Sequence, residues 1–186
     1  MNPTKIFLFL LFTVTNYACS QKVDDERKFK NTIELSIKSS SEKLNPLISN
    51  IGTHLKEQRT DSTLFRQYDE AKVNLTLNKK LVSELTEVDK KFNLREKTLL
   101  YFDNCSKLLD GSMLPAIKFI NGTEKLENLD LNSMFAQIQT AINDTFVLSE
   151  TLEQFCKKYK LDPKVELFEK NQYNAQIGEI KKMLEK

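Results

Sequence analysis

The sequence predicts an all-α protein, a mostly antiparallel four-helix bundle with an additional C-terminal helix. Two observations carry this prediction. Only four Gly and four Pro occur among 186 residues, too few for the many turns of a β fold of this length. Apolar residues also recur at alternating steps of four and three over long stretches, which is the spacing of a helix face that packs against other helices. Helices joined in sequence by short connections pack antiparallel, so a bundle is the expected arrangement.

The N-terminal segment predicts export. Met1 to Lys5 carries one positive charge, and the apolar run Ile6 to Val14 follows it. This order, ending in a small residue at Ala18, is typical of a secretory signal peptide. Nine residues of helix cover about 14 Å, whereas a bilayer core is about 30 Å thick. We therefore predict a signal peptide at residues 1–18 and no membrane-spanning helix there or later in the chain.

Cys19 is the predicted site of lipid attachment. Ala18-Cys19-Ser20 resembles the end of a bacterial lipobox, in which the thiol is diacylated and the cysteine becomes the first residue of the mature chain. Asn16 and Tyr17 depart from the Leu-like and small residues of that pattern. The alternative is cleavage after Ser20, which would leave a soluble secreted protein. Buried acyl methylenes would hold the chain to the membrane.

The residues after Cys19 carry a pattern that relates to where the protein is located in the cell. The stretch Gln21 to Glu26 resembles the Lys- and acid-containing tags that send some Bacteroidota lipoproteins to the outer face of the cell. Its alternative interpretations are a solvated tether, or acidic residues that favour the first turn of a helix. We expect a lipidated tether at residues 19–24 and one helical-bundle domain over residues 25–186, located at the outer membrane or cell surface.

The first two helices are predicted at residues 24–57 and 62–91. In the first, Pro46 is expected to kink or restart the helix, because proline lacks an N–H and crowds the preceding turn. Acid-first pairs four residues apart, such as Glu34–Lys38 and Glu153–Lys157, are expected on exposed helix faces. The second helix is predicted from a seam that alternates four and three. Its members are Leu64, Tyr68, Ala71, Leu75, Asn78, Val82, Leu85, Asp89 and Phe92.

A third helix is predicted at residues 94–110 and a fourth at 131–160. Asn93 is expected to cap the third helix, with Glu96 at the reciprocal capping-box position. The fourth shows a second seam of the same spacing. Its members are Leu131, Phe135, Ile138, Ile142, Thr145, Ser149, Leu152, Cys156 and Tyr159.

Glycine and proline are expected to break the chain between these two helices, at Gly111, Pro115 and Gly122. The apolar run 112–120 is expected to form a lid at one end of the bundle, the alternative being an exposed binding patch. Asp162 and Pro163 predict the start of a tail helix at about 163–185, because aspartate caps and proline fits the first turn.

Cys105 and Cys156 are predicted to be unpaired thiols. If the third helix runs on to about residue 120 and the fourth returns antiparallel, facing residue numbers sum to about 251. Cys105 then lies level with residue 146, about 15 Å along the axis from Cys156. Disulfide-bonded Cα atoms lie within about 7 Å of each other. The alternative is a parallel arrangement of the two helices, which would let the thiols meet.

Composition and motifs argue against catalysis and nucleic-acid binding. The formal charge of +2 falls to +1 once residues 1–18, with Lys5, are removed, which gives no electrostatic case for nucleic acid. The single histidine, His54, has Glu57 three positions later but no second Glu-x-x-His pair for a di-metal site. No motif in the sequence identifies a nucleophile that would act together with His54. The sequence also contains no Gly-rich phosphate-binding loop. We predict no catalytic residue, cofactor or metal site, and no enzymatic activity.

The layout of the chain resembles a family of uncharacterised helical surface proteins, mostly predicted lipoproteins, of Bacteroidota and spirochaetes. The resemblance covers about residues 19–161 and includes the ending Phe155-Cys156-Lys157-Lys158-Tyr159-Lys160-Leu161, where Cys156 replaces the usual small residue. It implies a surface location and no activity. The expected function is an exported, lipid-anchored, non-enzymatic module that binds an unknown protein partner at the cell surface or in the periplasm. The alternative is a soluble secreted helical protein with a ligand-binding or hydrolytic acidic site.

Overall fold

The computed structural model describes residues 3–57, 59–125, 127 and 129–162, with side chains from Asp24 onward except that of Leu131. Every regular element in this part of the chain is helical, which confirms the all-α prediction. The elements are α1 (Pro3–Glu57), α2 (Thr63–Ser83), α3 (Leu94–Leu108), the π-helix η1 (Leu109–Met113), α4 (Leu114–Ile120) and α5 (Leu131–Tyr159). The predicted tail helix at 163–185 lies outside the described residues.

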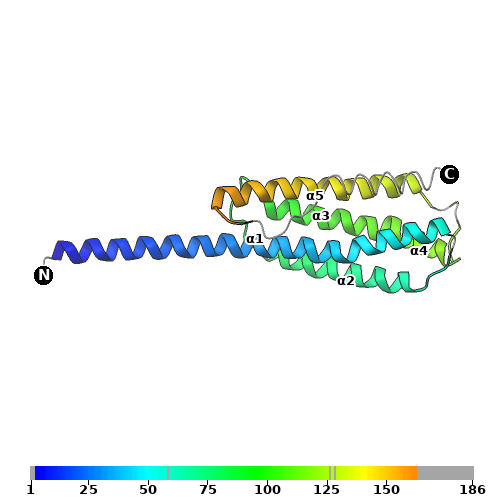
Figure 1. Cartoon of the computed structure of the whole chain (residues 1–186), viewed down its shortest axis with the longest axis horizontal. Helices are drawn as coiled ribbons and strands as arrows, with labels where there is room; N and C mark the ends of the chain where they lie inside the picture. The colour runs from blue at the N-terminus through cyan, green and yellow to red at the C-terminus, as the bar shows by residue number, and fades with distance from the viewer. Residues whose placement is uncertain (1–2, 58, 126, 128, 163–186) are drawn as a thin grey trace.

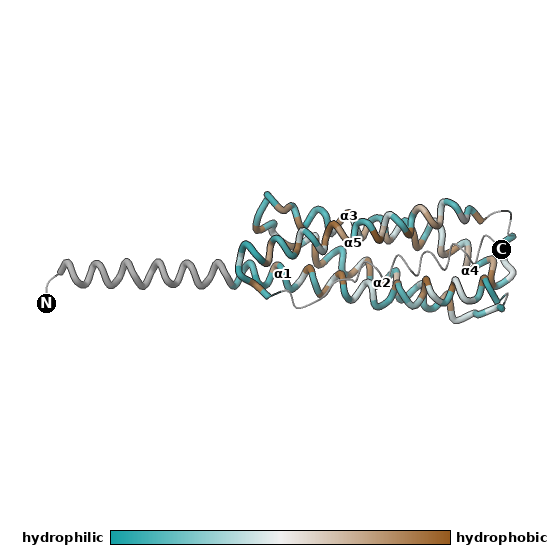
Figure 2. The backbone as a smooth tube through the Cα atoms, turned by 45° about the horizontal axis from the view of Figure 1, so that its top comes forward, coloured by the Kyte–Doolittle hydropathy of each residue, from teal (hydrophilic) through white to brown (hydrophobic). Residues whose placement is uncertain are grey.

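The four long helices α1, α2, α3 and α5 alternate in direction and lie side by side, and η1 and α4 continue α3 (Figure 1). The C-terminal half of α1 packs on α2, α2 packs on α3, and α3 packs on α5. The N-terminal half of α1 projects beyond the packed region. Hydrophobic and hydrophilic residues alternate along the packed helices (Figure 2), so each helix buries one face and leaves the other to solvent.

The first helix is longer than predicted. It begins at Pro3 instead of residue 24, so the leader and the first bundle helix form one continuous helix. The predicted end at Glu57 is confirmed. The helix also does not restart at Pro46. Leu44 and Leu47, on either side of the proline, are buried in the core, and this packing keeps the segment helical despite the lost backbone hydrogen bond.

The second helix ends at Ser83, before the predicted residue 91. The Ser83 hydroxyl donates a hydrogen bond to the Lys80 carbonyl (2.7 Å), and the Arg95 guanidinium donates to the Ser83 carbonyl (2.8 Å). These bonds satisfy the carbonyl groups of a terminating helix. Phe92 is still buried, although it lies in an irregular segment. The apolar spacing therefore continued past the end of the helix, which explains the wrong boundary.

The predicted capping box at the start of α3 is wrong. Asn93 adopts a left-handed conformation (φ 51°) and its side chain makes no capping hydrogen bond. The Glu96 carboxylate contacts the neighbouring Arg95 guanidinium instead of the backbone N–H of Asn93 that a capping box requires. The cap comes from the preceding loop, where the Glu87 carboxylate accepts a hydrogen bond from the Arg95 backbone N–H (2.8 Å).

Gly111 and Pro115 do not break the chain, contrary to the prediction. Helix continues through η1 and α4 to Ile120. Within η1 the Leu114 N–H donates to the Leu109 carbonyl, five residues back, and the wider turn precedes a proline that stands in the first turn of α4, where its missing N–H costs little. The break does occur at Gly122, whose φ of +73° favours glycine.

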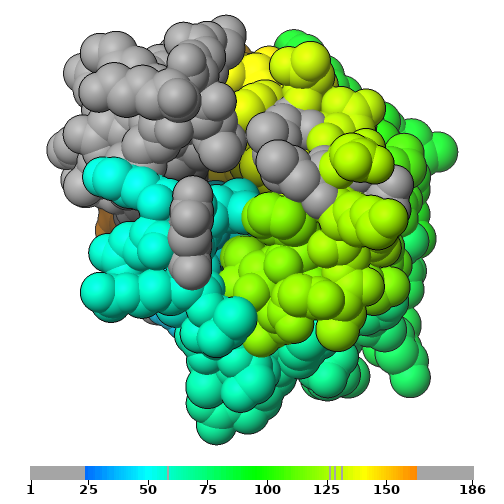
Figure 3. All heavy atoms as spheres, turned by 90° about the vertical axis from the view of Figure 1, so that its right-hand side faces the viewer, coloured from blue at the N-terminus to red at the C-terminus, as the bar shows by residue number. Residues whose placement is uncertain are grey.

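The apolar run 112–120 forms the end of η1 and all of α4 and is packed into the protein, so the exposed-patch alternative is wrong. Met113, Ala116 and Ile117 are almost completely buried. Their helix contacts both α1 and α2 at the end of the molecule where α1 finishes (Figure 3; α4 is yellow-green and the end of α1 is cyan). The run therefore covers that end of the core, as the lid interpretation expected.

The cysteine prediction is confirmed, because Cys105 and Cys156 are both free and buried. Side-chain hydrogen bonds fix the antiparallel register between α5 and the continuous segment formed by α3 and η1. They join Asn104 to Asp144 (2.7 Å), Lys97 to Thr151 (2.9 Å) and Ser112 to Gln137 (2.9 Å). Cys105 therefore lies opposite about residue 143, roughly 20 Å along the axis from Cys156.

We expect both thiols to resist modification in the native protein. Burial raises the pKa of Cys105 to about 12, and it also raises the pKa of Cys156, so neither forms the reactive thiolate at neutral pH. Iodoacetamide should leave both unmodified in buffer and alkylate both in unreduced, denatured protein. Denatured protein in which neither thiol reacts until a reductant is added would contradict the antiparallel register.

Candidate functional site

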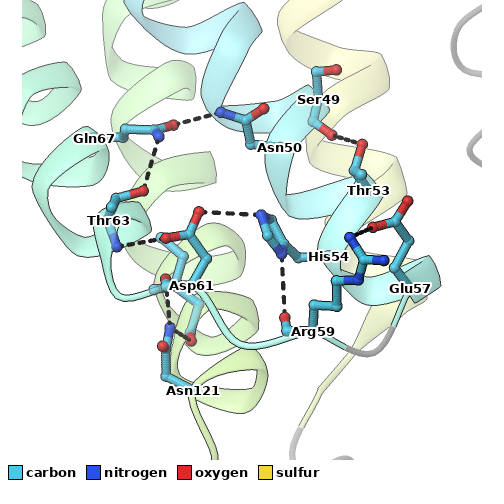
Figure 4. Close-up of polar contacts among 11 residues, drawn as sticks. Ser49, Asn50, Thr53, His54, Glu57, Arg59, Asp61, Thr63, Gln67 and Asn121 are labelled. Atoms are coloured by element: carbon cyan, nitrogen blue, oxygen red, sulfur yellow. Dashed lines mark hydrogen bonds and ion pairs between the residues drawn. The ribbon is translucent and has the colours of Figure 1, made fainter.

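The only histidine of the chain lies in a polar cluster at the turn between α1 and α2 (Figure 4). His54 Nε2 is 3.1 Å from an Asp61 carboxylate oxygen, and Nδ1 is 3.2 Å from the Arg59 carbonyl oxygen. The predicted neighbour Glu57 instead pairs with the Arg59 guanidinium at 3.2 Å. The chain leaves the helix between residues 57 and 63, so helical spacing does not predict a contact between residues 54 and 61, and sequence reasoning missed it.

Both ring nitrogens of His54 are engaged by acceptors. Nδ1 faces the Arg59 carbonyl and Nε2 faces the Asp61 carboxylate, so both nitrogens take part in contacts within the protein. The described part of the chain contains no group of three His, Cys, Asp or Glu side chains placed to hold a metal ion.

Asp61 connects three helices through this cluster. Hydrogen bonds from the side chain and backbone of Thr63 hold the pKa of Asp61 below its ordinary value, with a smaller contribution from the charge of His54. The Asn121 amide, at the end of α4, donates to the Asp61 carbonyl (3.1 Å). The cluster thus joins the end of α1, the start of α2 and the end of α4, which is a structural role.

A second cluster joins α2 to the π-helix. The Tyr68 hydroxyl donates to Asp110 (2.6 Å), and the Lys72 ammonium contacts the same carboxylate oxygen at 2.8 Å. The hydrogen bond to Asp110 raises the pKa of Lys72, and the same ammonium holds the pKa of Asp110 below its usual range. Desolvation raises the pKa of Tyr68. At neutral pH each group stays in its ordinary protonation state, so none is poised as a base or nucleophile.

A third cluster contains the same three residue types as the second, namely Asp, Lys and Tyr, and lies at the opposite end of the packed helices. Asp89, in the loop after α2, accepts hydrogen bonds from Tyr159 (2.9 Å) and Lys158. The ammonium of Lys158 also lies 5.5 Å from the ring centre of Phe92. The pKa of Asp89 is lowered, chiefly by the bond from Lys158, and that of Lys158 is raised by the same bond. These directions again favour an ion pair over catalysis.

These carboxylates predict a loss of stability in acid. The pKa values of Asp61, Asp89 and Asp110 lie below the ordinary 3.8 in the folded protein. Their contribution is therefore complete above the unfolded pKa and is lost as the pH falls through the lower folded values. The urea midpoint should drop between pH 6 and pH 3. Asp110→Asn should lower the midpoint at pH 6 and reduce the drop. An equal drop in variant and wild type would contradict the assignment of Asp110.

Large apolar side chains remain exposed on the outer helix faces. Three of them recur at steps of four along α2, namely Val73, Leu77 and Leu81, with exposed fractions of 60%, 57% and 51%. This spacing places them along one outward stripe of the helix. The seam residues of α2 are buried on the other side, so α2 is apolar on both its inner and its outer surface.

The predicted lipid-attachment residue, Cys19, lies within α1, and its side chain is outside the described residues. Among the described residues, no helix has a stretch long and apolar enough to cross a bilayer. Comparisons with protein families, with curated proteins and with solved structures found no match to this chain. The resemblance to helical surface lipoproteins therefore stays a prediction.

Proposed function

We propose that this protein is an exported, lipid-anchored helical module that binds a protein partner at the outer membrane or cell surface and has no catalytic activity. The observation that carries the proposal is the leader of residues 1–18 followed directly by Cys19. A thiol at that position is the natural acceptor of the acyl chains that hold a lipoprotein to a membrane.

The geometry of α1 supports an anchor placed close to the bundle. The helix runs without interruption from the leader to Glu57, and Phe29 is the first buried apolar residue among its described side chains, which begin at Asp24. Cys19 and Phe29 are ten residues apart, which is about 15 Å of helix. A lipid on Cys19 would therefore hold the end of the bundle that contains Phe29 next to the membrane and turn the α4 end away from it.

Two clusters, Tyr68–Lys72–Asp110 and Asp89–Lys158–Tyr159, support a non-enzymatic role, because in each of them the carboxylate and the ammonium group stay charged and paired with each other. The outward stripe of Val73, Leu77 and Leu81 supports partner binding, since a row of exposed apolar side chains favours contact with another protein. Leu77→Glu should leave thermal unfolding unchanged and abolish capture of the partner by the mature domain from intact cells. Unchanged capture would place the partner on another face.

Cys19→Ser tests the anchor. The variant is expected to lose metabolic labelling by palmitate and to leave the membrane fraction, because serine cannot accept the thioether-linked lipid. Ser20→Ala is the matched control, since it keeps Cys19 and a small residue beside it. Unchanged membrane fractionation of Cys19→Ser would count against the lipid anchor.

A further inference from the structure

Besides its buried seam, α2 carries a second row of regularly spaced residues on the opposite face. The members follow at alternating steps of four and three, which is the spacing of a helix face that packs against another helix. They are Arg66, Glu70, Val73, Leu77, Lys80 and Glu84, and all of them are exposed. We call these six residues the α2 outer row.

The α2 outer row points away from the helices that pack on α2. Asn74 donates a hydrogen bond to α1 and Lys79 contacts α3. At 100° per residue, the centre of the row lies about 80° around the helix from Asn74 and about 140° from Lys79. In the described part of the chain, Glu70 is the one charged member with an ion-pair partner, Lys43 at 3.1 Å, and both side chains remain about half exposed. The row therefore keeps its charges and its apolar centre open to another molecule.

The charges of the row are complementary to those of a second copy of α2 that lies antiparallel to the first. When the two helices are centred on residue 75, facing residue numbers sum to about 150. The facing pairs are then Arg66 with Glu84, Glu70 with Lys80, and Val73 with Leu77, each formed twice. Apolar side chains thus meet at the centre, and opposite charges meet on both sides of it.

Other arrangements of two α2 helices bring like charges together. A parallel pair places each charged member of the row against itself. An antiparallel pair centred on Leu77 places Glu70 against Glu84. Like charges in contact are unfavourable, whereas exposed ion pairs add little to affinity. The apolar centre would therefore supply most of the attraction, and the charges select the register centred on residue 75.

We propose that the partner at the outer face of α2 is a second copy of this chain, docked antiparallel through the α2 outer row. This inference rests on the proposed function, because it names the protein partner of that same surface. Each α1 extends beyond the packed helices at one end only (Figure 1), so the antiparallel pair carries its two Cys19 residues at opposite ends. With Cys19 lipidated, the pair joins molecules that are anchored in two facing membranes.

Cysteine cross-linking of the mature protein in detergent tests the register. Under mild oxidation, a mixture of Arg66→Cys and Glu84→Cys should form a disulfide-linked dimer that contains one chain of each variant. Each variant alone is the matched control and should stay monomeric. In the proposed register, position 66 lies about 27 Å along the axis from position 66 of the second copy, too far for a disulfide. The native Cys105 and Cys156 are buried and should not compete.

A cross-linked dimer of Arg66→Cys alone would indicate parallel packing and overturn the proposal. A mixture that gives no dimer would overturn self-association at this face. If Leu77→Glu still abolished capture of a different protein from intact cells, the proposed partner binding would stand although this inference had failed.

Vesicle clustering, followed by light scattering, tests the contact between membranes. Wild-type lipidated protein should bind phosphatidylcholine vesicles and cluster them. Lys80→Glu should bind equally well but fail to cluster them, because residue 80 then faces the Glu70 of a second copy. Glu70→Lys/Lys80→Glu should restore clustering, since it exchanges the two charges. Wild-type protein that binds vesicles without clustering them would overturn the contact between membranes. Loss of vesicle binding with retained cross-linking would count against the proposed anchor and leave the antiparallel dimer supported.

Discussion

Replacing Phe155 with alanine is expected to lower the free energy of unfolding by about 3–5 kcal/mol, the usual cost of removing a fully buried phenylalanine ring. The side chain is completely buried. Its ring centre lies 5.8 Å from that of Phe29, 5.6 Å from that of Phe92 and 4.7 Å from that of Tyr159. It therefore joins α1, the loop after α2 and the end of α5, and a cavity there would loosen all three.

Urea unfolding followed by far-ultraviolet circular dichroism measures this loss. Phe119→Ala is the matched control, because it removes the same ring from a half-buried position on α4, and it should cost less than half as much. If the two variants lost equal stability, Phe155 would not be the centre of the packing between these elements.

Replacing Lys30 with methionine is expected to cost about 3–5 kcal/mol of unfolding free energy, because it removes one partner of the buried ion pair with Glu34. The pair lies at 3.1 Å with both side chains 2% exposed. The substitution also removes the donor to the Asp162 carbonyl (2.5 Å). Methionine retains most of the volume, so the loss reports charge and hydrogen bonding more than packing.

The double variant Lys30→Met/Glu34→Leu separates these contributions. It removes both charges, so it should recover most of the stability that Lys30→Met loses, in a double-mutant cycle measured by urea unfolding. Lys38→Met is a surface control and should change stability little, because its contact with Glu42 at 3.9 Å is exposed. If the double variant lost as much stability as Lys30→Met and Glu34→Leu lose together when measured singly, the pair would not be coupled.

The helices could be predicted from the sequence because their spacing is a local property. The seam from Leu64 to Val82 is buried as expected, and the pair Glu153–Lys157 forms on an exposed face at 2.7 Å. Glu34 shows the limit of this reasoning. It was expected to pair with Lys38 at the surface, but it is buried and pairs with Lys30 instead. Which flank of a helix is covered depends on segments distant in sequence.

Helix ends were predicted less well, because they depend on contacts between elements. The second helix ends at Ser83. The carbonyl of Ser83 accepts a hydrogen bond from the guanidinium of Arg95, twelve residues later. Glu87 caps the third helix from a loop in place of Asn93. The π-turn that carries helix past Gly111 and Pro115 has no signature in the apolar spacing.

The candidate sites were also beyond sequence reasoning. The sequence suggested Glu57, three residues after His54, as its partner. In the structure the carboxylate beside His54 is that of Asp61, across the turn. The pairing of Asp89 with Lys158 and Tyr159 spans about seventy residues of sequence. Such contacts follow only from the way the helices are brought together, so composition and spacing could exclude a metal motif but could not find these clusters.

The mass of the N-terminal peptide of the mature protein, purified from membranes of the cells that make it, tests the central claim most directly. The account predicts that the chain begins at Cys19 and carries a diacylglyceryl group on the thiol. A mature chain that begins at Gln21 with no lipid would contradict the anchor, and with it the placement of this protein at a membrane.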